Sequence, residues 1–212
     1  MQSTMFLLRI NIKRITKLLV LTLVITMLSS CATVTSHNIS SDAKFDTKSL
    51  TPKLASITKW EAKGVIGIIH DNDADSASYV YIQNGDTFNI KLYGPMGIGS
   101  VEIFGSDNKV TLKTSDGKST QSSDIKSLMM QQLGWYVPVD GLKYWIKSTV
   151  VPGNEFKVQK NTNNLPSEIS QDGWDIKYKN YKLVDNKYPL ATNIKMKRKN
   201  MSIKIIIKEW QL

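Results

Sequence analysis

The chain has 212 residues, of which 41% are hydrophobic and 22% charged, and a formal net charge of +10. This length and composition suit one domain with one sizeable core. Lysine carries most of the positive charge, without the arginine clusters and interleaved aromatic residues that favour nucleic-acid recognition, so we expect no nucleic-acid partner. The single cysteine excludes an internal disulfide.

The first thirty residues predict an export signal. Four basic residues and no acidic residue accompany an apolar run over residues 18–28. This run is too short to cross about 30 Å of hydrocarbon as a stable transmembrane helix. A basic start, a short apolar middle and small residues at the end are typical of a secretory signal peptide.

The end of this signal, Leu28-Ser29-Ser30-Cys31, resembles the bacterial lipobox, although glycine or alanine is commoner than Ser30 before the cleavage site. In a lipobox the cysteine thiol receives a diacylglyceryl group and the signal is cut just before it. We therefore predict a cleaved lipoprotein signal peptide over residues 1–30 and lipidation of Cys31. The alternative is an ordinary signal peptide with an incidental cysteine. The mature chain would keep a net charge of about +6, which suits a surface near anionic lipid headgroups.

Residues 31–57 are polar and show no sustained period, so we expect a polar tether ahead of a domain over residues 58–212. A short amphipathic helix within this segment is a weaker expectation, based on Phe45, Leu50, Leu54 and Ile57. The domain then opens with predicted strands near residues 65–69, 77–83, 88–92, 101–104 and 110–113. Phe88, Ile90 and Leu92 alternate with polar neighbours, as a half-buried strand should. Turn residues such as Asn84-Gly85 separate these strands.

The middle of the domain changes to helical spacing. Ser123 is expected to cap a helix that ends at Gly134, and Asp140 to cap a second, short helix after Pro138. Strands resume near residues 174–178, 194–196 and 201–210. Nine or ten alternating strands without βαβ crossovers predict a mainly β fold, a meandering antiparallel sheet. A sheet of this size must curl, and the two helices would cover its apolar concave face.

The sequence offers little for catalysis. His37 and His70 are the only histidines and neither has a motif partner. An acidic cluster, Asp71, Asp73 and Asp75, lacks the glycine and the distal glutamate of a calcium-binding EF-hand loop, so we interpret it as a solvated hairpin tip. We expect neither an enzyme nor a metal site.

The loop over residues 94–99 and a set of aromatic residues are the candidate binding features. A phosphate-binding loop would precede a helix, whereas a strand is expected here after Gly99. The loop residues Pro95, Met96, Gly97 and Ile98 either form an exposed apolar tip suited to membrane contact or fold against the core. The aromatic residues are either core or the wall of a cavity between sheet and helices: Trp60, Tyr81, Trp145, Trp174 and Trp210.

Four segments follow one another in a specific order: Ala62-Lys63-Gly64, Asn84-Gly85-Asp86, Gly94-Pro95-Met96-Gly97 and Val137-Pro138-Val139-Asp140-Gly141-Leu142-Lys143-Tyr144-Trp145-Ile146. With the final strand and the lipobox, this order resembles the LolB family of outer-membrane lipoproteins. Members of that family receive lipoproteins from the periplasmic carrier LolA. The resemblance implies an unclosed, strongly curved antiparallel β-barrel with a short α-helical lid over a hydrophobic cavity, and no cofactor.

The resemblance also implies roles for individual residues. Met96 occupies the place of the family's leucine that puts cargo into the membrane, and Tyr81 stands where the family has tryptophan. The expected acyl-chain cavity consists of Tyr81, Leu128, Trp145, Ile146 and Trp174. Ala32, after the lipidated cysteine, lacks the aspartate that retains lipoproteins at the inner membrane, which implies anchoring at the periplasmic face of the outer membrane. The expected partners are LolA, lipoprotein cargo and outer-membrane lipid, and the expected state is a monomer. The alternative is a lipid-anchored structural or signalling lipoprotein that binds another lipid or a protein.

Overall fold

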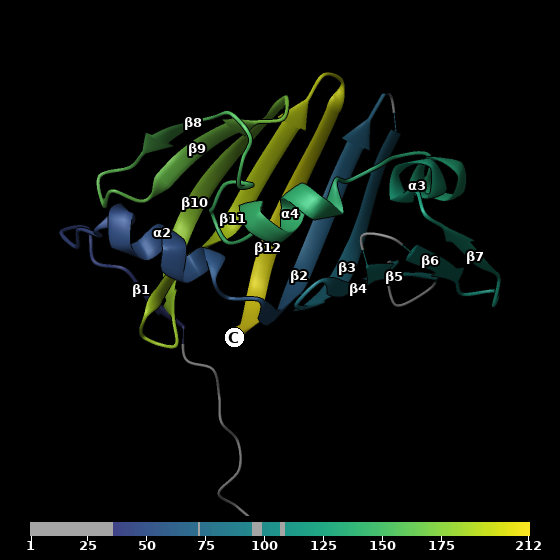
Figure 1. Ribbon diagram of the computed structural model, residues 1–212, viewed down its shortest axis with the longest axis horizontal. Helices are drawn as coiled ribbons and strands as arrows, with labels where there is room; N and C mark the ends of the chain where they lie inside the picture. The colour runs from purple at the N-terminus through teal and green to yellow at the C-terminus, as the bar shows by residue number, and fades with distance from the viewer. Residues whose placement is uncertain (1–35, 72, 95–98, 107–108) are drawn as a thin grey trace, which may run out of the picture. The chain divides into compact units, whose positions relative to one another are not determined.

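The structure is a computed structural model that describes residues 36–71, 73–94, 99–106 and 109–212 (Figure 1). Cys31 and the loop residues Pro95, Met96, Gly97 and Ile98 lie outside these ranges, and so does the predicted signal peptide. All of these described residues belong to one compact unit. Within its described part, every helix is too short or too polar to cross a membrane.

Twelve strands and three helices build the described part of the unit. The helices are α2 (Thr47–Ala55), α3 (Ile125–Leu133) and α4 (Val139–Trp145). The strands are β1 (Ser36–Asn38), β2 (Lys59–His70), β3 (Asp73–Asn84), β4 (Thr87–Tyr93), β5 (Ser100–Ser106), β6 (Lys109–Thr114), β7 (Ser119–Ser122), β8 (Phe156–Lys160), β9 (Pro166–Gln171), β10 (Trp174–Val184), β11 (Tyr188–Arg198) and β12 (Met201–Gln211).

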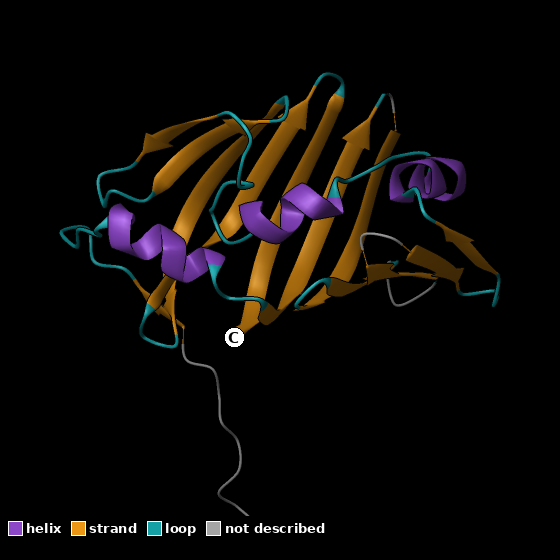
Figure 2. Cartoon of the chain, viewed as in Figure 1, coloured by secondary structure: helices purple, strands orange, loops and turns teal. Residues whose placement is uncertain are grey.

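One antiparallel sheet contains all of these strands, in the order β7-β6-β5-β4-β3-β2-β12-β11-β10-β9-β8, with β1 added to β10. The chain moves outward from β2 to one edge at β7 and must then reach the opposite edge at β8. The connection therefore crosses one face of the sheet, and it is this connection that contains α3 and α4 (Figures 1 and 2). Since β7 and β8 end the order, the sheet is not closed. The predicted fold class, an unclosed antiparallel barrel with helices over its face, is confirmed.

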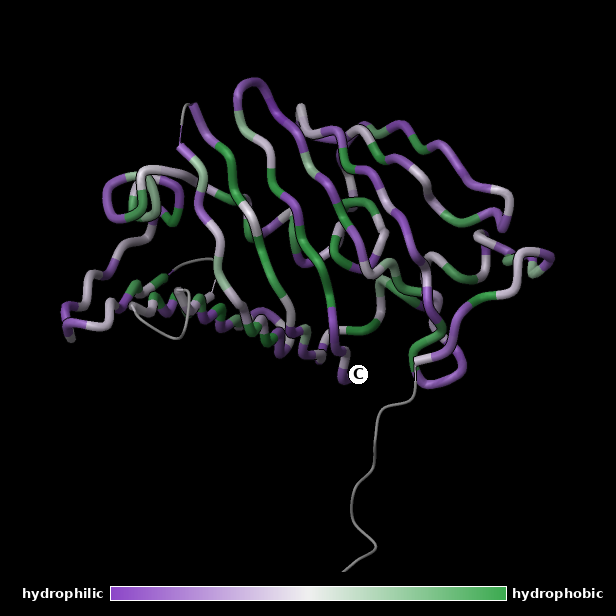
Figure 3. The backbone as a smooth tube through the Cα atoms, turned by 180° about the vertical axis from the view of Figure 1, so that it is seen from behind, coloured by the Kyte–Doolittle hydropathy of each residue, from purple (hydrophilic) through white to green (hydrophobic). Residues whose placement is uncertain are grey.

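Residues alternate between the covered and the open face of the central strands, which keeps apolar side chains on one side. On β2, Trp60, Ala62, Ile66 and Ile68 are buried, while Lys59 on the other face is exposed. Figure 2 shows α2 and α4 in front of the sheet, and Figure 3 shows from behind the face that they do not cover. The covered face supplies most of the core.

The segment expected to be a tether is structured over residues 36–57, so that expectation is wrong for this part. β1 pairs with β10, with Ser36 opposite Val184, and α2 begins after the cap Asp46. Leu54 is only 4% exposed and belongs to the core. The weaker expectation of an amphipathic helix is the one that holds, because its apolar stripe needs the sheet as cover.

Both helix caps differ from the prediction. Asp124, not Ser123, caps α3, since its carboxylate accepts hydrogen bonds from the backbone N–H groups of Lys126 and Ser127. Pro138 stands at the N-cap of α4 without a side-chain cap, and Asp140 lies in the first turn. A carboxylate in the first turn still favours the positive end of the helix dipole. Gly134 ends α3 in the left-handed conformation, as expected.

Candidate functional site

The last residue of α4 places the largest side chain of the interior between helix and sheet. Trp145 is 1% exposed, and its ring lies 6.4 Å from the ring of Trp174 on β10. A β-carbon at Gly141 would approach the Trp145 ring to 2.5 Å. Only glycine one helical turn earlier therefore lets this indole fold back against its own helix.

A buried amide holds this end of α4 to the edge of the sheet. The Gln171 Oε1 atom accepts hydrogen bonds from Trp145 Nε1 at 2.9 Å and from the backbone N–H of Val151 at 2.8 Å. Its Nε2 atom donates to the carbonyl oxygen of Val151 at 2.9 Å. We call Gln171, Trp145 and Val151 the Gln171 network. Gln171 is 3% exposed, so these bonds are made away from water.

A buried lysine joins the end of α4 to the end of α2. Lys147 is 3% exposed, and its ammonium donates to the carbonyl oxygen of Ile57 at 2.7 Å and to that of Ala55 at 3.4 Å. Burial, assisted by the nearby charge of Lys143, lowers the pKa of Lys147 to about 8. The two helices over the sheet thus share one polar contact, at a cation that is costly to desolvate.

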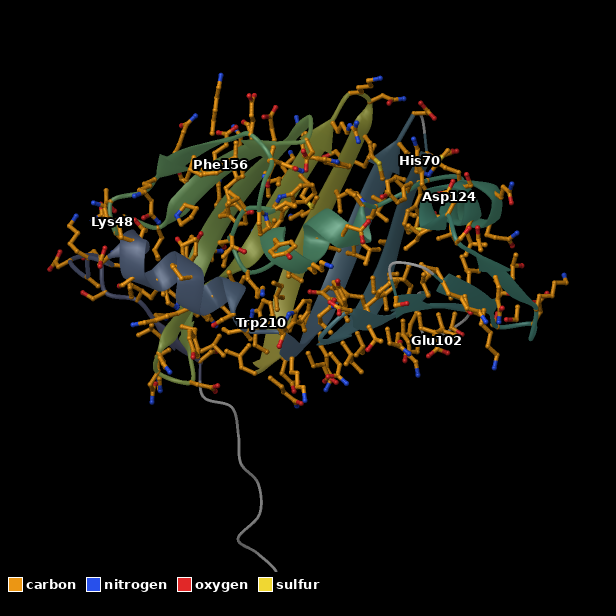
Figure 4. The ribbon with its side chains drawn as sticks, in the orientation of Figure 1. Lys48, His70, Glu102, Asp124, Phe156 and Trp210 are labelled. Atoms are coloured by element: carbon orange, nitrogen blue, oxygen red, sulfur yellow. The ribbon has the colours of Figure 1, made fainter. Side chains whose placement is uncertain are left out.

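A second aromatic group fills the opposite end of the covered face. Trp60 lies 4.5 Å from Tyr81 and 5.5 Å from Trp210 between ring centroids, in edge-to-face arrangements that aromatic pairs favour. Figure 4 labels Trp210 at the C-terminal end of β12. The Tyr81 hydroxyl donates to Gln83 Oε1 at 2.9 Å, and burial raises the pKa of Tyr81.

Several polar atoms in this interior have no hydrogen-bond partner among the described residues. They are Trp60 Nε1, Tyr79 OH, Trp174 Nε1, Tyr178 OH and Trp210 Nε1. All five side chains belong to the apolar core cluster. An unpaired buried donor costs roughly 1–3 kcal/mol. The interior is therefore apolar with scattered donors, which suits long apolar groups that carry occasional carbonyl oxygens.

An open hollow lies beside the packed interior, between α3 and the sheet. We call this the α3 hollow; its volume is about 430 Å³, within the range of small-molecule pockets. Its walls come from five strands, the end of α3 and Trp135, two residues after that helix. The apolar residues that line it are Ile66, Ile68, Ala77, Leu92, Val101, Leu133 and Trp135.

The α3 hollow lies at the base of the loop over residues 94–99. Gly94 and Gly99 both line it, and the Gly94 backbone N–H donates to the Gly99 carbonyl oxygen at 3.0 Å. Tyr93 pairs with Ser100, so β4 and β5 form the hairpin that the sequence predicts. The interpretation of this loop as a hairpin connection is confirmed, whereas its apolar tip lies outside the described residues.

The structure buries all five residues predicted to line the cavity: Tyr81, Leu128, Trp145, Ile146 and Trp174. It brings Trp145 and Trp174 together and places Tyr81 in the other aromatic group. In this conformation they pack in the core, and the α3 hollow is lined by other residues. Strand alternation contained a signal for Ile66, Ile68 and Leu92, whereas nothing in the sequence placed Gln171 beside Trp145.

The acidic residues at the tip of the β2–β3 hairpin do not form a group of candidate metal ligands among the described residues. Asp71, Asp73 and Asp75 are exposed, and the described part of the chain holds no group of three or more ligand side chains that could bind a metal ion. His70 contacts Asp75, with 3.3 Å between Nε2 and Oδ2.

Known proteins match this chain over nearly its full length. The model of the family described as "Outer membrane lipoprotein LolB" matches residues 58–210. An outer-membrane lipoprotein LolB of Francisella tularensis subsp. tularensis (strain WY96-3418) is 52% identical over 205 residues, 97% of this chain and 99% of the relative. The LolB of Pseudomonas paraeruginosa (strain DSM 24068 / PA7) is 29% identical over 188 residues, 87% of this chain and 91% of the relative.

Solved structures add a likeness of fold. The crystal structure of a LolA superfamily protein from Nitrosomonas europaea superposes with a TM-score of 0.53, covering 79% of this chain and 94% of that chain, at 10% sequence identity. At this identity the likeness concerns the fold alone. The sequence matches decide the family, and they agree with the order of segments and with the helices over an unclosed sheet. The chain therefore belongs to the LolB family.

Proposed function

We propose that this protein is the acceptor of lipoproteins at the outer membrane, where the lipid on Cys31 anchors it. It would receive cargo from a periplasmic carrier of the LolA type, bind the acyl chains of the cargo and insert them into the bilayer. The observation that carries the proposal is a LolB family match over residues 58–210, which hold nearly all of the sheet whose apolar face lies under helices. No catalytic step or cofactor is needed.

The energetic logic is the cost of exposed acyl chains. Burial of one methylene is worth about 0.8 kcal/mol, so a long acyl chain in water costs on the order of 10 kcal/mol. A lipoprotein therefore needs a cover in the aqueous compartment, and transfer runs downhill if each acceptor buries the chains better than the last. Apolar walls with few polar anchors discriminate little between cargoes, which suits a general acceptor.

The α3 hollow offers an opening for a first acyl chain. It is already open at the base of the 94–99 loop, and Ile66 and Ile68 continue from it into the core along β2. Further chains need room that the packed interior lacks, so we propose that α4 is displaced and that Tyr81, Leu128, Trp145, Ile146 and Trp174 then line the enlarged cavity. Met96 would act in the next step, as the loop residue that enters the bilayer during delivery.

The test is a transfer assay with the anchored chain in liposomes and a carrier loaded with fluorescent lipoprotein. We expect cargo to leave the carrier and appear with the liposomes. Trp145→Asp should reduce acceptance at least tenfold, because an unpaired charge would face an apolar wall. Lys179→Ala, an exposed change on β10, is the matched control and should transfer normally. Cargo that stays on the carrier with wild-type protein, or equal transfer by both folded variants, would refute the proposal.

A further inference from the structure

A second hollow, of about 300 Å³, shares Trp135 with the α3 hollow and joins segments far apart in the sequence. We call it the rim hollow. It is bordered by α3, by the end of β2 and by the turn between β11 and β12. These two strand ends are neighbours in the sheet, because His70 pairs with Met201. Figure 4 labels His70 at this end of β2 and Asp124 at the start of α3.

The polar groups around the rim hollow are mostly donors. Lys126, Arg198 and Lys199 line it, and none of them forms an ion pair with another residue in the part of the chain that the structure describes. The Arg198 guanidinium lies 5.9 Å from the centre of the Trp174 ring. Arg198 is also the only arginine of the predicted mature chain. A guanidinium presents a planar fork of donors that matches phosphate and carboxylate oxygens.

Trp174 also lines this hollow and is 2% exposed, and its Nε1 atom is buried without a hydrogen-bond partner among the described residues. His70 and Asp71 line the hollow as well; the Asp71 carboxylate accepts a hydrogen bond from the side-chain amide of Asn200, and His70 contacts Asp75. The three cations of the lining therefore outnumber its one carboxylate. A ligand that supplies acceptor oxygens and negative charge would fit this surplus of donors.

The remaining lining is apolar, so the ligand has two parts. Met130, Trp135 and Met201 form walls beside the cations, and Met130 is 48% exposed. Inorganic phosphate would leave these apolar walls exposed to water, whereas an acyl chain alone would leave the cations without an anionic partner. An amphiphile with an anionic head and an apolar tail satisfies both sets of groups.

We propose that the rim hollow binds the phosphate headgroup of an anionic phospholipid, with the first part of its acyl chains against Met130, Trp135 and Met201. The turn after β2, the loop after β4 and the turn after β11 leave their strands in the same direction, as the antiparallel order requires. The binding site rests on the described residues alone and is independent of the proposed function.

The experiment measures binding to the full lipidated chain in a neutral detergent by native mass spectrometry. The probes are dihexanoyl phosphatidylglycerol, dihexanoylglycerol, which lacks the phosphate, and inorganic phosphate. We expect the phospholipid to bind at least tenfold more tightly than either of the others, and less tightly as salt is raised. Equal binding of dihexanoylglycerol would overturn the headgroup role. Equal binding of inorganic phosphate would overturn the lipid assignment.

A charge-matched pair of variants locates the site. Lys126→Gln with Arg198→Gln should weaken phosphatidylglycerol binding at least tenfold, whereas Lys179→Gln with Lys204→Gln removes the same charge from exposed positions elsewhere and should change it less than twofold. If both double variants lost phosphatidylglycerol affinity equally, net charge alone would explain the effect and the proposal would be overturned. Circular dichroism checks the fold, and the single variant Lys126→Gln serves if the double variant unfolds. Cargo acceptance by wild-type protein is measured separately, so a protein that accepts cargo but shows no phosphate preference refutes only this inference.

Discussion

Replacement of Gln171 by methionine should destabilise the domain and loosen the cover over the sheet. Methionine keeps the length and the apolar stem of the side chain but removes both hydrogen-bonding atoms. The Gln171 network would lose the bonds to Trp145 Nε1, at 2.9 Å, and to the Val151 backbone, at 2.8 and 2.9 Å. The indole N–H would then be buried without a partner, because Trp145 is 1% exposed.

The expected loss of unfolding free energy follows from these three hydrogen bonds. A hydrogen bond contributes about 1 kcal/mol net, and a buried donor left unpaired costs about 1–3 kcal/mol. Val151 is only partly buried, so water can replace part of its loss. We therefore expect Gln171→Met to lower the free energy of unfolding by about 3 kcal/mol. Gln159→Met, at an exposed glutamine on the neighbouring strand β8, is the control and should change it by less than about 0.5 kcal/mol.

Two assays check the reasoning. Urea unfolding followed by circular dichroism gives the free energies, and a double-mutant cycle with Trp145→Phe isolates the bond to the indole, for which we expect a coupling of about 1 kcal/mol. A fluorescent lipid should bind Gln171→Met as tightly as wild type or more tightly, because a less stable closed state raises the population that can bind. A loss below about 0.5 kcal/mol, or strict additivity in the cycle, would refute the network as a constraint on α4.

Three further predictions concern the anchor, the loop and the buried lysine. Cys31→Ala should block signal processing, and wild-type mature protein without acyl groups on Cys31 in mass spectrometry would contradict the lipoprotein assignment. Met96→Glu should leave folding and acceptance from the carrier intact but reduce delivery to liposomes, because a carboxylate must be desolvated among lipid tails; normal delivery would exclude an insertion role. The folded pKa of Lys147, about 8, lies below its ordinary value of 10.5, so the unfolded state binds more protons between these values and stability rises with pH there. Relative to Lys147→Met, wild type should gain on the order of 3 kcal/mol in free energy of unfolding from about pH 8 to pH 10.5, and a flat difference would contradict burial of the ammonium.

Strand alternation predicted the central sheet because the helices cover only one of its faces. β2, β10 and β12 each have one buried and one exposed face, and the two-residue period is visible in their sequences. The edge strand β7 is polar and carries no such period. On the other edge strand, β8, Phe156 and Val158 alternate with polar residues, but the strand is exposed along its whole length, so this period marks no buried face. The segment before residue 58 was misjudged as a tether for a related reason, since most residues of α2 are polar and Leu54 alone is buried.

The residues of the candidate site could be predicted from the sequence, but the closed packing of those residues could not. Helical spacing put Trp145 on the inner face of α4, and alternation put Trp174 on the inner face of β10. The sequence could not show that the two rings lie together in a closed interior, since that depends on an amide 26 positions from Trp145 and on a lysine that bonds to carbonyl groups about 90 positions earlier. The rim hollow depends likewise on a strand pairing between residues 70 and 201.

The two polar contacts at the end of α4 are one part of what the cargo must overcome to displace this helix. The other part is the burial of apolar side chains that are 1–5% exposed: Val139, Leu142, Trp145 and Ile146. The Gln171 network contributes about 3 kcal/mol to holding α4 against the sheet. The Lys147 contact contributes less, because the lowered pKa of Lys147 shows that its hydrogen bonds only partly offset the cost of burying the ammonium. One acyl chain brings on the order of 10 kcal/mol when it leaves water. We therefore expect that acyl chains which take the place of the α4 side chains against the sheet can displace the helix without nucleotide hydrolysis, whereas without cargo the polar contacts and the apolar packing together keep the interior closed. A domain with many more such bonds would bind its cargo more weakly, and one without them would open more often and expose its aromatic interior to water.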